Sequence, residues 1–291
     1  MRWLQRGRAS SELARAVISR SRVTRETCIR SKSGTSFRSD EGHELTLNGF
    51  GVMMCRHDPF EEAWIEAASR ITGHGCALEI GGAFGRASID ALQRGCPHVV
   101  CNDLSSAHLA EVQRRHETLA SGQGSLSTLA GGVPAVLDEW LPPTPLRAIL
   151  AANILHFLSP EDVRRTFTRL HNLCSDGAEF FVSVDAPWNG GFRPFWPLYT
   201  ARRMLGDAHP GYTTFPGPMR HALPARLRAV KVYHPMEPQQ LAALLDESGW
   251  EVVSARHFAG DAAGNPEGVS VGNGVEMSGA HAIRRGGERR L

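Results

Sequence analysis

Near-continuous apolar runs alternate with helix-forming segments through the middle of the chain. Such runs are typical of strands that are buried on both faces of a parallel sheet. The expected strands are residues 76–80, 98–102, 127–130, 147–155 and 179–184. The expected helices between them run from about 86 to 94, from Ser105 or Ser106 to Ala120, and from Ser159 onward. Alternating strands and helices predict a doubly wound α/β fold, in which helices cover both faces of the sheet.

Further elements lie on either side of this core. The tetrapeptide Asp58-Pro59-Phe60-Glu61 predicts the start of a packing helix, because it offers a capping side chain, a proline at the first helical position and the acid of a capping box. After a long interruption, a helix is expected at 235–248, followed by strands near 251–258 and 275–283. The segments together predict a mostly parallel sheet of seven strands.

One domain with appendages is expected. The 291 residues are 42% hydrophobic and 21% charged, which is ordinary for a globular chain, and single cores stop growing near ~250–300 residues. Residues 43–291 are assigned to that domain and 1–42 to a basic, flexible extension, in which ten Arg and Lys face two acids up to residue 38. The functional alternative for the extension is a transit peptide, whose Arg- and Ser-rich, acid-poor composition it resembles.

The remaining composition bears on location and partners. The longest apolar stretch, 148–158, is interrupted by Asn153 and His156 and is too short to span a bilayer. Six scattered Cys without a CxxC pair predict a reduced, cytoplasmic setting, and thirteen dispersed His predict no metal site. Basic residues concentrate in 1–38 and 186–236 while the remainder is net acidic, so nucleic acid is not an expected partner.

A glycine-rich segment, Gly81-Gly82-Ala83-Phe84-Gly85, joins the first expected strand to the helix that follows it. The next strand ends at Asp103. Doubly wound folds use this arrangement to hold the ribose of a nucleoside cofactor, and the carboxylate can accept both ribose hydroxyls. A dinucleotide fingerprint aligned from Gly81 requires glycine at Ala83 and at Arg86, so a nicotinamide dehydrogenase is disfavoured.

Read instead as acid-x-G-x-G-x-G, the segment supplies Glu79, Gly81, Ala83 and Gly85, with alanine in place of one glycine. This form resembles the first motif of class I S-adenosylmethionine-dependent methyltransferases. Residues 99–105 resemble the second motif of that family and 148–158 the fourth, and the closing helix and two strands resemble its usual C-terminal end. The similarity covers about 60–185 and 235–283.

The resemblance implies S-adenosylmethionine as the cofactor and assigns residues to it. The implied contacts are Gly81, Gly82, Ala83 and Gly85 under the methionine and ribose, Glu79 orienting that loop or reaching the amino group through water, Asp103 on the ribose, Leu104 on adenine, and Asn153 beside the sulfonium. Many members carry an acid after the third strand to accept the adenine amine, where this chain has Gly131-Gly132-Val133. Backbone groups or Asp138 are the alternatives for that contact.

Methyl transfer is an in-line displacement that needs a base only if the acceptor must lose a proton. His156, three residues past Asn153 at the expected sheet edge, is the first candidate base, with a structural role as its alternative. Asp185, at the end of the fifth strand, is the second candidate, with capping of the next turn as its alternative. His234 is the third.

Residues 186–236 are interpreted as an inserted substrate lid. They contain eight of the 21 aromatic residues: Trp188, Phe192, Phe195, Trp196, Tyr199, Tyr212, Phe215 and Tyr233. Rigid aromatics in a loop-like stretch above the cofactor edge favour a pocket wall, and a small satellite core is the alternative. Five arginines of the segment are candidates to meet a carboxylate or phosphate on the acceptor: Arg202, Arg203, Arg220, Arg226 and Arg228.

The leading hypothesis is therefore an S-adenosylmethionine-dependent methyltransferase that acts on O, N or C of a small organic acceptor. Methylation of RNA or protein is one alternative, favoured by the basic segments and by aromatics that can stack bases. Against it stand the net acidic core and the lack of an NPPY-like tetrapeptide. A protein that binds S-adenosylmethionine without turnover is the other alternative.

Overall fold

The computed structural model describes residues 46, 56–119, 123–214, 232–260 and 273–286. The chain divides into two units, Met1–Ser36 and Phe37–Leu291, and every described residue belongs to the second. The extension predicted for 1–42 lies outside the described residues.

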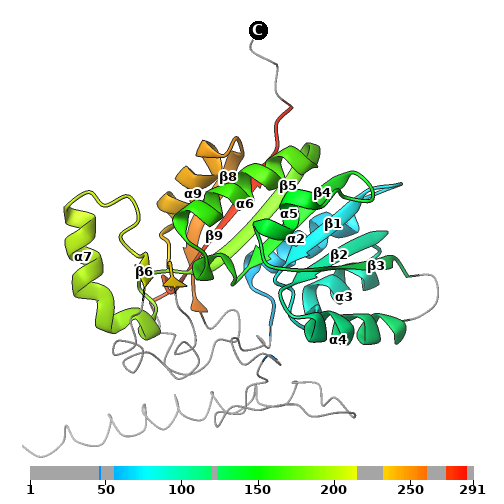
Figure 1. Cartoon of the computed structure of the whole chain (residues 1–291), viewed down its shortest axis with the longest axis horizontal. Helices are drawn as coiled ribbons and strands as arrows, with labels where there is room; N and C mark the ends of the chain where they lie inside the picture. The colour runs from blue at the N-terminus through cyan, green and yellow to red at the C-terminus, as the bar shows by residue number, and fades with distance from the viewer. Residues whose placement is uncertain (1–45, 47–55, 120–122, 215–231, 261–272, 287–291) are drawn as a thin grey trace, which may run out of the picture. The chain divides into compact units, whose positions relative to one another are not determined.

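A seven-stranded sheet forms the centre of the described part, in the order β3-β2-β1-β4-β5-β9-β8. Its strands are β1 Cys76–Ile80, β2 His98–Asp103, β3 Ser125–Ala130, β4 Leu146–Ala152, β5 Cys174–Asp185, β8 Glu251–Phe258 and β9 Met277–Ile283. Strands β1 to β5 pair in parallel, whereas β9 is antiparallel to both β5 and β8. The predicted α/β fold with a mostly parallel sheet of seven strands is confirmed (Figure 1).

Helices cover both faces of this sheet (Figure 1). On one face are α2 Pro59–Ser69, α3 Arg86–Gln93 and α4 Ser106–Glu117, and on the other are α5 Ala135–Glu139, α6 Pro160–Leu173 and α9 Pro238–Glu247. Successive strand residues enter opposite cores, as Ile149 and Leu150 do in β4, and both are fully buried. Because both faces are covered, the central strands β1 and β4 are apolar along most of their length, whereas the outer strands β3 and β8 carry polar residues and are partly exposed.

The caps expected from the sequence fix where three helices begin. Asp58 accepts hydrogen bonds from the backbone N–H groups of Phe60 and Glu61, and Glu61 accepts one from the backbone of Asp58. The side chain of Ser105 caps α4 and that of Ser159 caps α6. Each cap satisfies amides that the first turn leaves unpaired.

Several element boundaries differ from the predicted ones. Strand β4 ends at Ala152 rather than at residue 155, because Asn153 adopts a left-handed backbone with φ +57° and a 3-10 turn, η1 Leu155–Phe157, follows. Strand β5 begins at Cys174, five residues earlier than expected, where it continues directly from α6. Helix α9 begins at Pro238 rather than 235, since Met236 still bonds through its backbone N–H to the carbonyl of Asp185.

The described part of the insertion contains η2 Gly190–Phe195, α7 Trp196–Met204 and a two-stranded pair, β6 Thr213–Thr214 with β7 Val232–Tyr233. Its aromatics pack on one another: Phe192, Phe195, Tyr199 and Tyr233 are buried together, and Phe157, Trp188 and Trp196 are partly buried against them. The satellite core, which was the alternative interpretation, is therefore present. None of the helices in the described ranges is both long and apolar enough to cross a membrane.

Candidate functional site

The segment after β1 is a tight loop whose glycines are required by neighbouring side chains. Gly81 and Gly85 have φ values of +70° and +65°, in the left-handed region that glycine adopts without strain. A Cβ on Gly81 would lie 2.9 Å from Cγ2 of Ile154, and one on Gly85 would lie 2.5 Å from Cγ1 of Val112. The loop is closed by a 2.7 Å hydrogen bond from Gly85 N to Gly82 O.

Ala83 also adopts a left-handed conformation, with φ +47°. An L-residue with a Cβ pays roughly 1–2 kcal/mol there relative to the right-handed region. A hydrogen bond of 2.9 Å from Ala83 N to Oδ2 of Asp103 holds the residue in place. Ala83, where the sequence departs from the glycine pattern, is thus strained and is bonded to Asp103, the residue expected to bind the ribose.

Asp103 faces the loop from the end of β2. Its Oδ2 accepts from Ala83 N, and its Oδ1 accepts from Ser105 N at 2.8 Å and contacts Nδ1 of His108 at 2.9 Å. The side chain is 9% exposed. A carboxylate has about four acceptor positions, so these three contacts leave one position. In this geometry Asp103 can accept one ribose hydroxyl directly and accepts a second only if Ala83 N–H is released.

His108 was not predicted from the sequence. It is buried in the first turn of α4, and its Nε2 has no hydrogen-bond partner among the described residues. Nδ1 is therefore the nitrogen that carries the proton and donates to Asp103. The ring also packs edge-on against Phe84 of the loop, with centroids 5.4 Å apart. An His five residues after the acid, within the first turn of a capped helix, is the only signal for this contact that the sequence carries.

Leu104 presents an apolar side chain, 70% exposed, beside the loop that follows β3. A Cβ on Gly132 would lie 3.5 Å from Cδ1 of Leu104. Asn102, which the sequence did not single out, fixes this loop by donating from Nδ2 to the carbonyl oxygens of Leu129 and Gly131. Leu104 is thus exposed beside the Gly132 turn, and its contact with adenine stays a prediction.

Asp138 does not turn toward Leu104. Its carboxylate forms an ion pair with Arg165 of α6, at 3.0 Å, and its side chain is 48% exposed. Asp138 therefore has a partner of its own, and which group meets the adenine amine stays a prediction.

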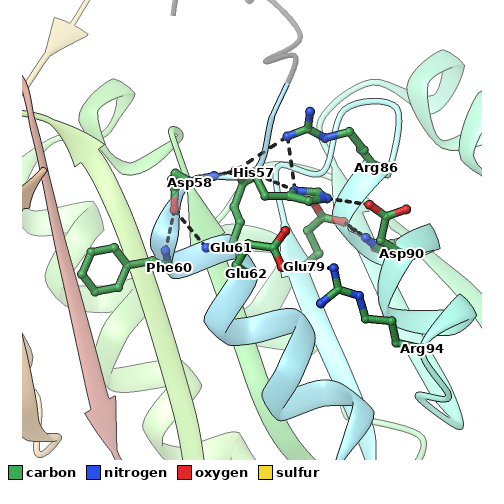
Figure 2. Close-up of polar contacts among 10 residues, drawn as sticks. His57, Asp58, Phe60, Glu61, Glu62, Glu79, Arg86, Asp90 and Arg94 are labelled. Atoms are coloured by element: carbon green, nitrogen blue, oxygen red, sulfur yellow. Dashed lines mark hydrogen bonds and ion pairs between the residues drawn. The ribbon is translucent and has the colours of Figure 1, made fainter. Parts of the chain in front are cut away.

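Glu79 lies beneath the loop and holds the start of α3. Its Oε2 accepts hydrogen bonds from N and Oγ of Ser88, and burial raises the pKa of Glu79 to about 7. Orientation of the loop, the first of the two roles expected for Glu79, is what these contacts support. A polar cluster adjoins it, in which the His57 ring lies between Asp90, at 2.6 Å, and Arg86, at 3.2 Å (Figure 2).

A second group of predicted residues lies at the ends of β4 and β5. Asn153 is joined to β5 by a 2.9 Å hydrogen bond from its N to Ser183 O. His156 is buried, and its Nδ1 accepts from Asp185 N at 3.2 Å, while its Nε2 lies 4.0 Å from Oδ2 of Asp185. Because Nδ1 accepts a hydrogen bond, a neutral ring carries its proton on Nε2. Neither nitrogen then has a free lone pair with which to take a proton from a methyl acceptor.

Tyr233 completes this second group. Its hydroxyl donates a hydrogen bond to Oδ2 of Asp185 and accepts one from Nδ2 of Asn189 at 3.2 Å. Tyr233 and Asn189 are both buried. The sequence placed Tyr233 among the aromatics of the insertion but did not connect it to Asp185, because the two are 48 residues apart.

His234 stays outside this polar group. Its ring packs against those of His209 and Tyr212, with centroids 5.4 Å and 5.7 Å away, and burial lowers its pKa to about 3. Its backbone N–H bonds to the carbonyl of His156 at 2.7 Å. Among the residues that the structure describes, no group of three or more His, Cys, Asp or Glu is arranged to hold a metal ion.

The two groups of predicted residues meet at the carboxyl edge of the sheet. Strands β1 and β4 are neighbours, and Ile154, directly after Asn153, lies over Gly81.

A surface depression bordered by α9 and β8 shares no residue with either group. It is lined by Ala242, Ala243, Asp246, Gly249, Trp250, Glu251, Val252 and Arg285.

No protein-family model matches the sequence, and no curated protein matches it. Solved structures do match. A SAM-dependent methyltransferase from Methanosarcina mazei aligns over 79% of this chain and 99% of its own, with a TM-score of 0.56 and 13% identity. A S-adenosylmethionine-dependent methyltransferase from Clostridium acetobutylicum aligns over 78% of this chain and 91% of its own, with a TM-score of 0.50 and 9% identity. The chain has the class I S-adenosylmethionine-dependent methyltransferase fold, as the sequence motifs predicted.

Proposed function

We propose that the protein is an S-adenosylmethionine-dependent methyltransferase that acts on a small organic acceptor. The observation that carries the proposal is the position of Asp103, whose carboxylate faces the glycine loop with one acceptor position left. A buried carboxylate beside a loop at the carboxyl edge of a doubly wound sheet fits a ribose hydroxyl. The exposed face of Leu104 beside Gly132 fits the attached adenine.

Bound S-adenosylmethionine would supply an electrophilic methyl group on a positively charged sulfur. The residues of this chain would hold it in line with the acceptor: Gly81, Gly82, Ala83 and Gly85 below the methionine and ribose, Asp103 on the ribose, Leu104 on adenine and Asn153 near the sulfur. Glu79 would fix the loop through α3. Alignment of this kind can lower a barrier by as much as ~7–11 kcal/mol.

On the acceptor side, the geometry favours Asp185 over His156 as the group that meets the substrate. The Asp185 side chain is 16% exposed, whereas that of His156 is 4% exposed with its nitrogens directed at Asp185. We therefore assign His156 a positioning role, which is the structural alternative to a role as the base. In this proposal the described parts of the insertion, 186–214 and 232–236, cover the acceptor side, and the partly buried Trp188 and Trp196 are the residues proposed to contact a substrate. Residues 215–231 lie outside the described residues.

Two of the five arginines expected to meet an acidic acceptor are described by the structure, and both have partners within the protein. Arg202 bonds to Tyr212 O and lies 4.0 Å from Asp207, and Arg203 pairs with Glu237. Arg220, Arg226 and Arg228 lie outside the described residues. A cytoplasmic location also stays a prediction.

Conversion of S-adenosylmethionine to S-adenosylhomocysteine over a metabolite panel, followed by mass spectrometry, tests the function. We expect acceptor-dependent formation of S-adenosylhomocysteine together with a product heavier by one methylene. Binding of the cofactor without consumption over the panel would favour the non-catalytic alternative, to which the burial of His156 lends some support. Turnover with mixed RNA or protein, and not with metabolites, would favour the macromolecular alternative.

A further inference from the structure

Among the described residues, the side chains nearest to the carboxylate oxygens of Asp185 are a tyrosine hydroxyl and a histidine ring. Oδ2 of Asp185 accepts the hydroxyl proton of Tyr233 and lies 4.0 Å from Nε2 of His156. Nδ1 of His156 accepts the backbone N–H of Asp185, so in this geometry that nitrogen carries no proton. Within the described ranges, no Arg or Lys lies within ion-pair distance of Asp185.

Two acids of the insertion and its flank have cations as partners. Glu237 pairs with Arg203 at 3.1 Å, and Asp207 lies 4.0 Å from Arg202. Asp185 is more buried than Asp207, with 16% against 40% of the side chain exposed, and yet it has no Arg or Lys as a partner in the described ranges. A largely buried anion is costly without a counter-charge. Its surroundings therefore favour a ligand that brings a positive charge.

The aromatic rings around His156, which lies next to Asp185, suit the same kind of ligand. Phe157 and Tyr233 lie 4.2 Å and 5.5 Å from the ring of His156, centroid to centroid. Trp188, at the start of the insertion, is partly buried against the same cluster. Aromatic faces attract an ammonium ion and stabilise it further when water is excluded. A carboxylate bordered by aromatic rings is a common receptor for a protonated amine.

The carboxylate also lies where an acceptor is needed. Ala152 of β4 pairs with Ser183 of β5. Asn153 comes directly after Ala152 and Asp185 two residues after Ser183, so the two residues lie at the ends of neighbouring strands. The proposed function places Asn153 near the sulfur. Resting on that proposed function, we propose that Asp185 binds the amino group of an amine acceptor, oriented by Tyr233, and that the reaction is N-methylation.

The chemistry balances without a further reactant. The bound ammonium gives one proton to Asp185, which passes it to water, and the freed lone pair of the nitrogen attacks the methyl carbon. The N–C bond forms as the C–S bond breaks, and the electron pair of that bond remains on sulfur. The positive charge moves from sulfur to nitrogen, directly opposite Asp185. A carboxylate or phosphate on the acceptor would instead be repelled.

Three ligands of matched shape test the proposal on the full chain saturated with S-adenosylhomocysteine: 2-phenylethylamine, 2-phenylethanol and phenylacetate. Calorimetry measures their affinities for wild type, for Asp185→Asn and for Asp207→Asn, a control acid in the same insertion. We expect wild type and Asp207→Asn to prefer the amine over the alcohol by at least about tenfold and over the acid by more, and Asp185→Asn to lose that preference.

The affinity of each protein for S-adenosylhomocysteine separates the two hypotheses. Absence of that binding in wild type would overturn the proposed function. Normal cofactor binding with no preference for the amine, with no amine binding at all, or with an unchanged preference in Asp185→Asn would overturn the amine assignment alone. If Asp185→Asn binds S-adenosylhomocysteine as wild type does, loss of its amine preference cannot result from misfolding. Assays with S-adenosylmethionine should then give methylated nitrogen in the amine product and little turnover of the alcohol.

Discussion

Nδ1 of His108 lies 2.9 Å from Oδ1 of Asp103, and both side chains are almost fully buried. The same carboxylate receives Ala83 N on its other oxygen. The first turn of α4 and the glycine loop therefore fix the orientation of Asp103 from two sides, before any ligand binds.

Replacement of His108 should weaken cofactor binding through Asp103. We expect His108→Leu to lower the affinity for S-adenosylhomocysteine by about tenfold, because one hydrogen bond to the carboxylate is lost. In His108→Asn the amide nitrogen can take the place of Nδ1, so the affinity should stay close to that of wild type. His116→Leu is the control on the same helix, since the side chain of His116 bonds to Gly124 O and to no other group in the described ranges. Equal affinities for His108→Leu and His116→Leu would show that His108 does not position Asp103.

Replacement of Ala83 by glycine should stabilise the protein. Glycine removes the strain of φ +47° but adds freedom to the unfolded chain, so a net gain of about 0.5–1 kcal/mol is expected. Ala110→Gly, at an exposed helical position of α4, should instead cost about 1 kcal/mol. Urea unfolding of both variants makes the comparison. A destabilised Ala83→Gly would mean that the left-handed conformation is not the strained one at this site.

The polar cluster beside Glu79 should make stability fall as the pH rises. Burial lowers the pKa of His57, but the hydrogen bond to Asp90 and the carboxylate of Glu61, 3.9 Å away, outweigh it and raise the pKa from 6.5 to about 9 (Figure 2). Burial raises the pKa of Glu79 from 4.5 to about 7. A group with a raised pKa in the folded state contributes stability below its unfolded pKa and loses it as the pH rises through the folded value.

The contribution of Glu79 to the free energy of unfolding should therefore be lost between about pH 4.5 and 7, and the contribution of His57 between about pH 6.5 and 9. For His57 the loss is at most about 3 kcal/mol. His57→Gln should flatten the pH dependence of the free energy of unfolding between about pH 6.5 and 9 only. His116→Gln should leave the pH dependence as it is in wild type. A wild-type stability that rises between pH 6.5 and 9 would contradict the assignment of His57 as the protonated partner of Asp90.

The sequence was most informative where local chemistry decides the outcome. The caps at Asp58, Ser105 and Ser159 depend on side chains within three residues of the helix start, and the buried strands on runs of apolar residues. Asp103 could be placed at the loop because the carboxyl ends of neighbouring parallel strands meet at one edge.

Contacts across long separations were out of reach of the same reasoning. Tyr233 reaches Asp185 from 48 residues away, and no periodic pattern links the two. The hydrogen bond that Nδ1 of His156 accepts comes from a backbone N–H that lies 29 residues further along the chain. The aromatics of the insertion fit either a pocket wall or a satellite core by composition alone, and their packing on one another could not be predicted from it.

Calorimetry with S-adenosylhomocysteine on wild type, Asp103→Asn and the control Asp246→Asn tests the central claim most directly, since Asp246 is an exposed acid on α9. A parallel titration with adenosine and 2′,3′-dideoxyadenosine isolates the ribose hydroxyls. We expect Asp103→Asn alone to bind S-adenosylhomocysteine at least about tenfold more weakly, and to lose the preference for adenosine that wild type shows. Equal binding by wild type and Asp103→Asn, or no binding by wild type, would contradict the claim that Asp103 and the glycine loop hold the nucleoside of S-adenosylmethionine.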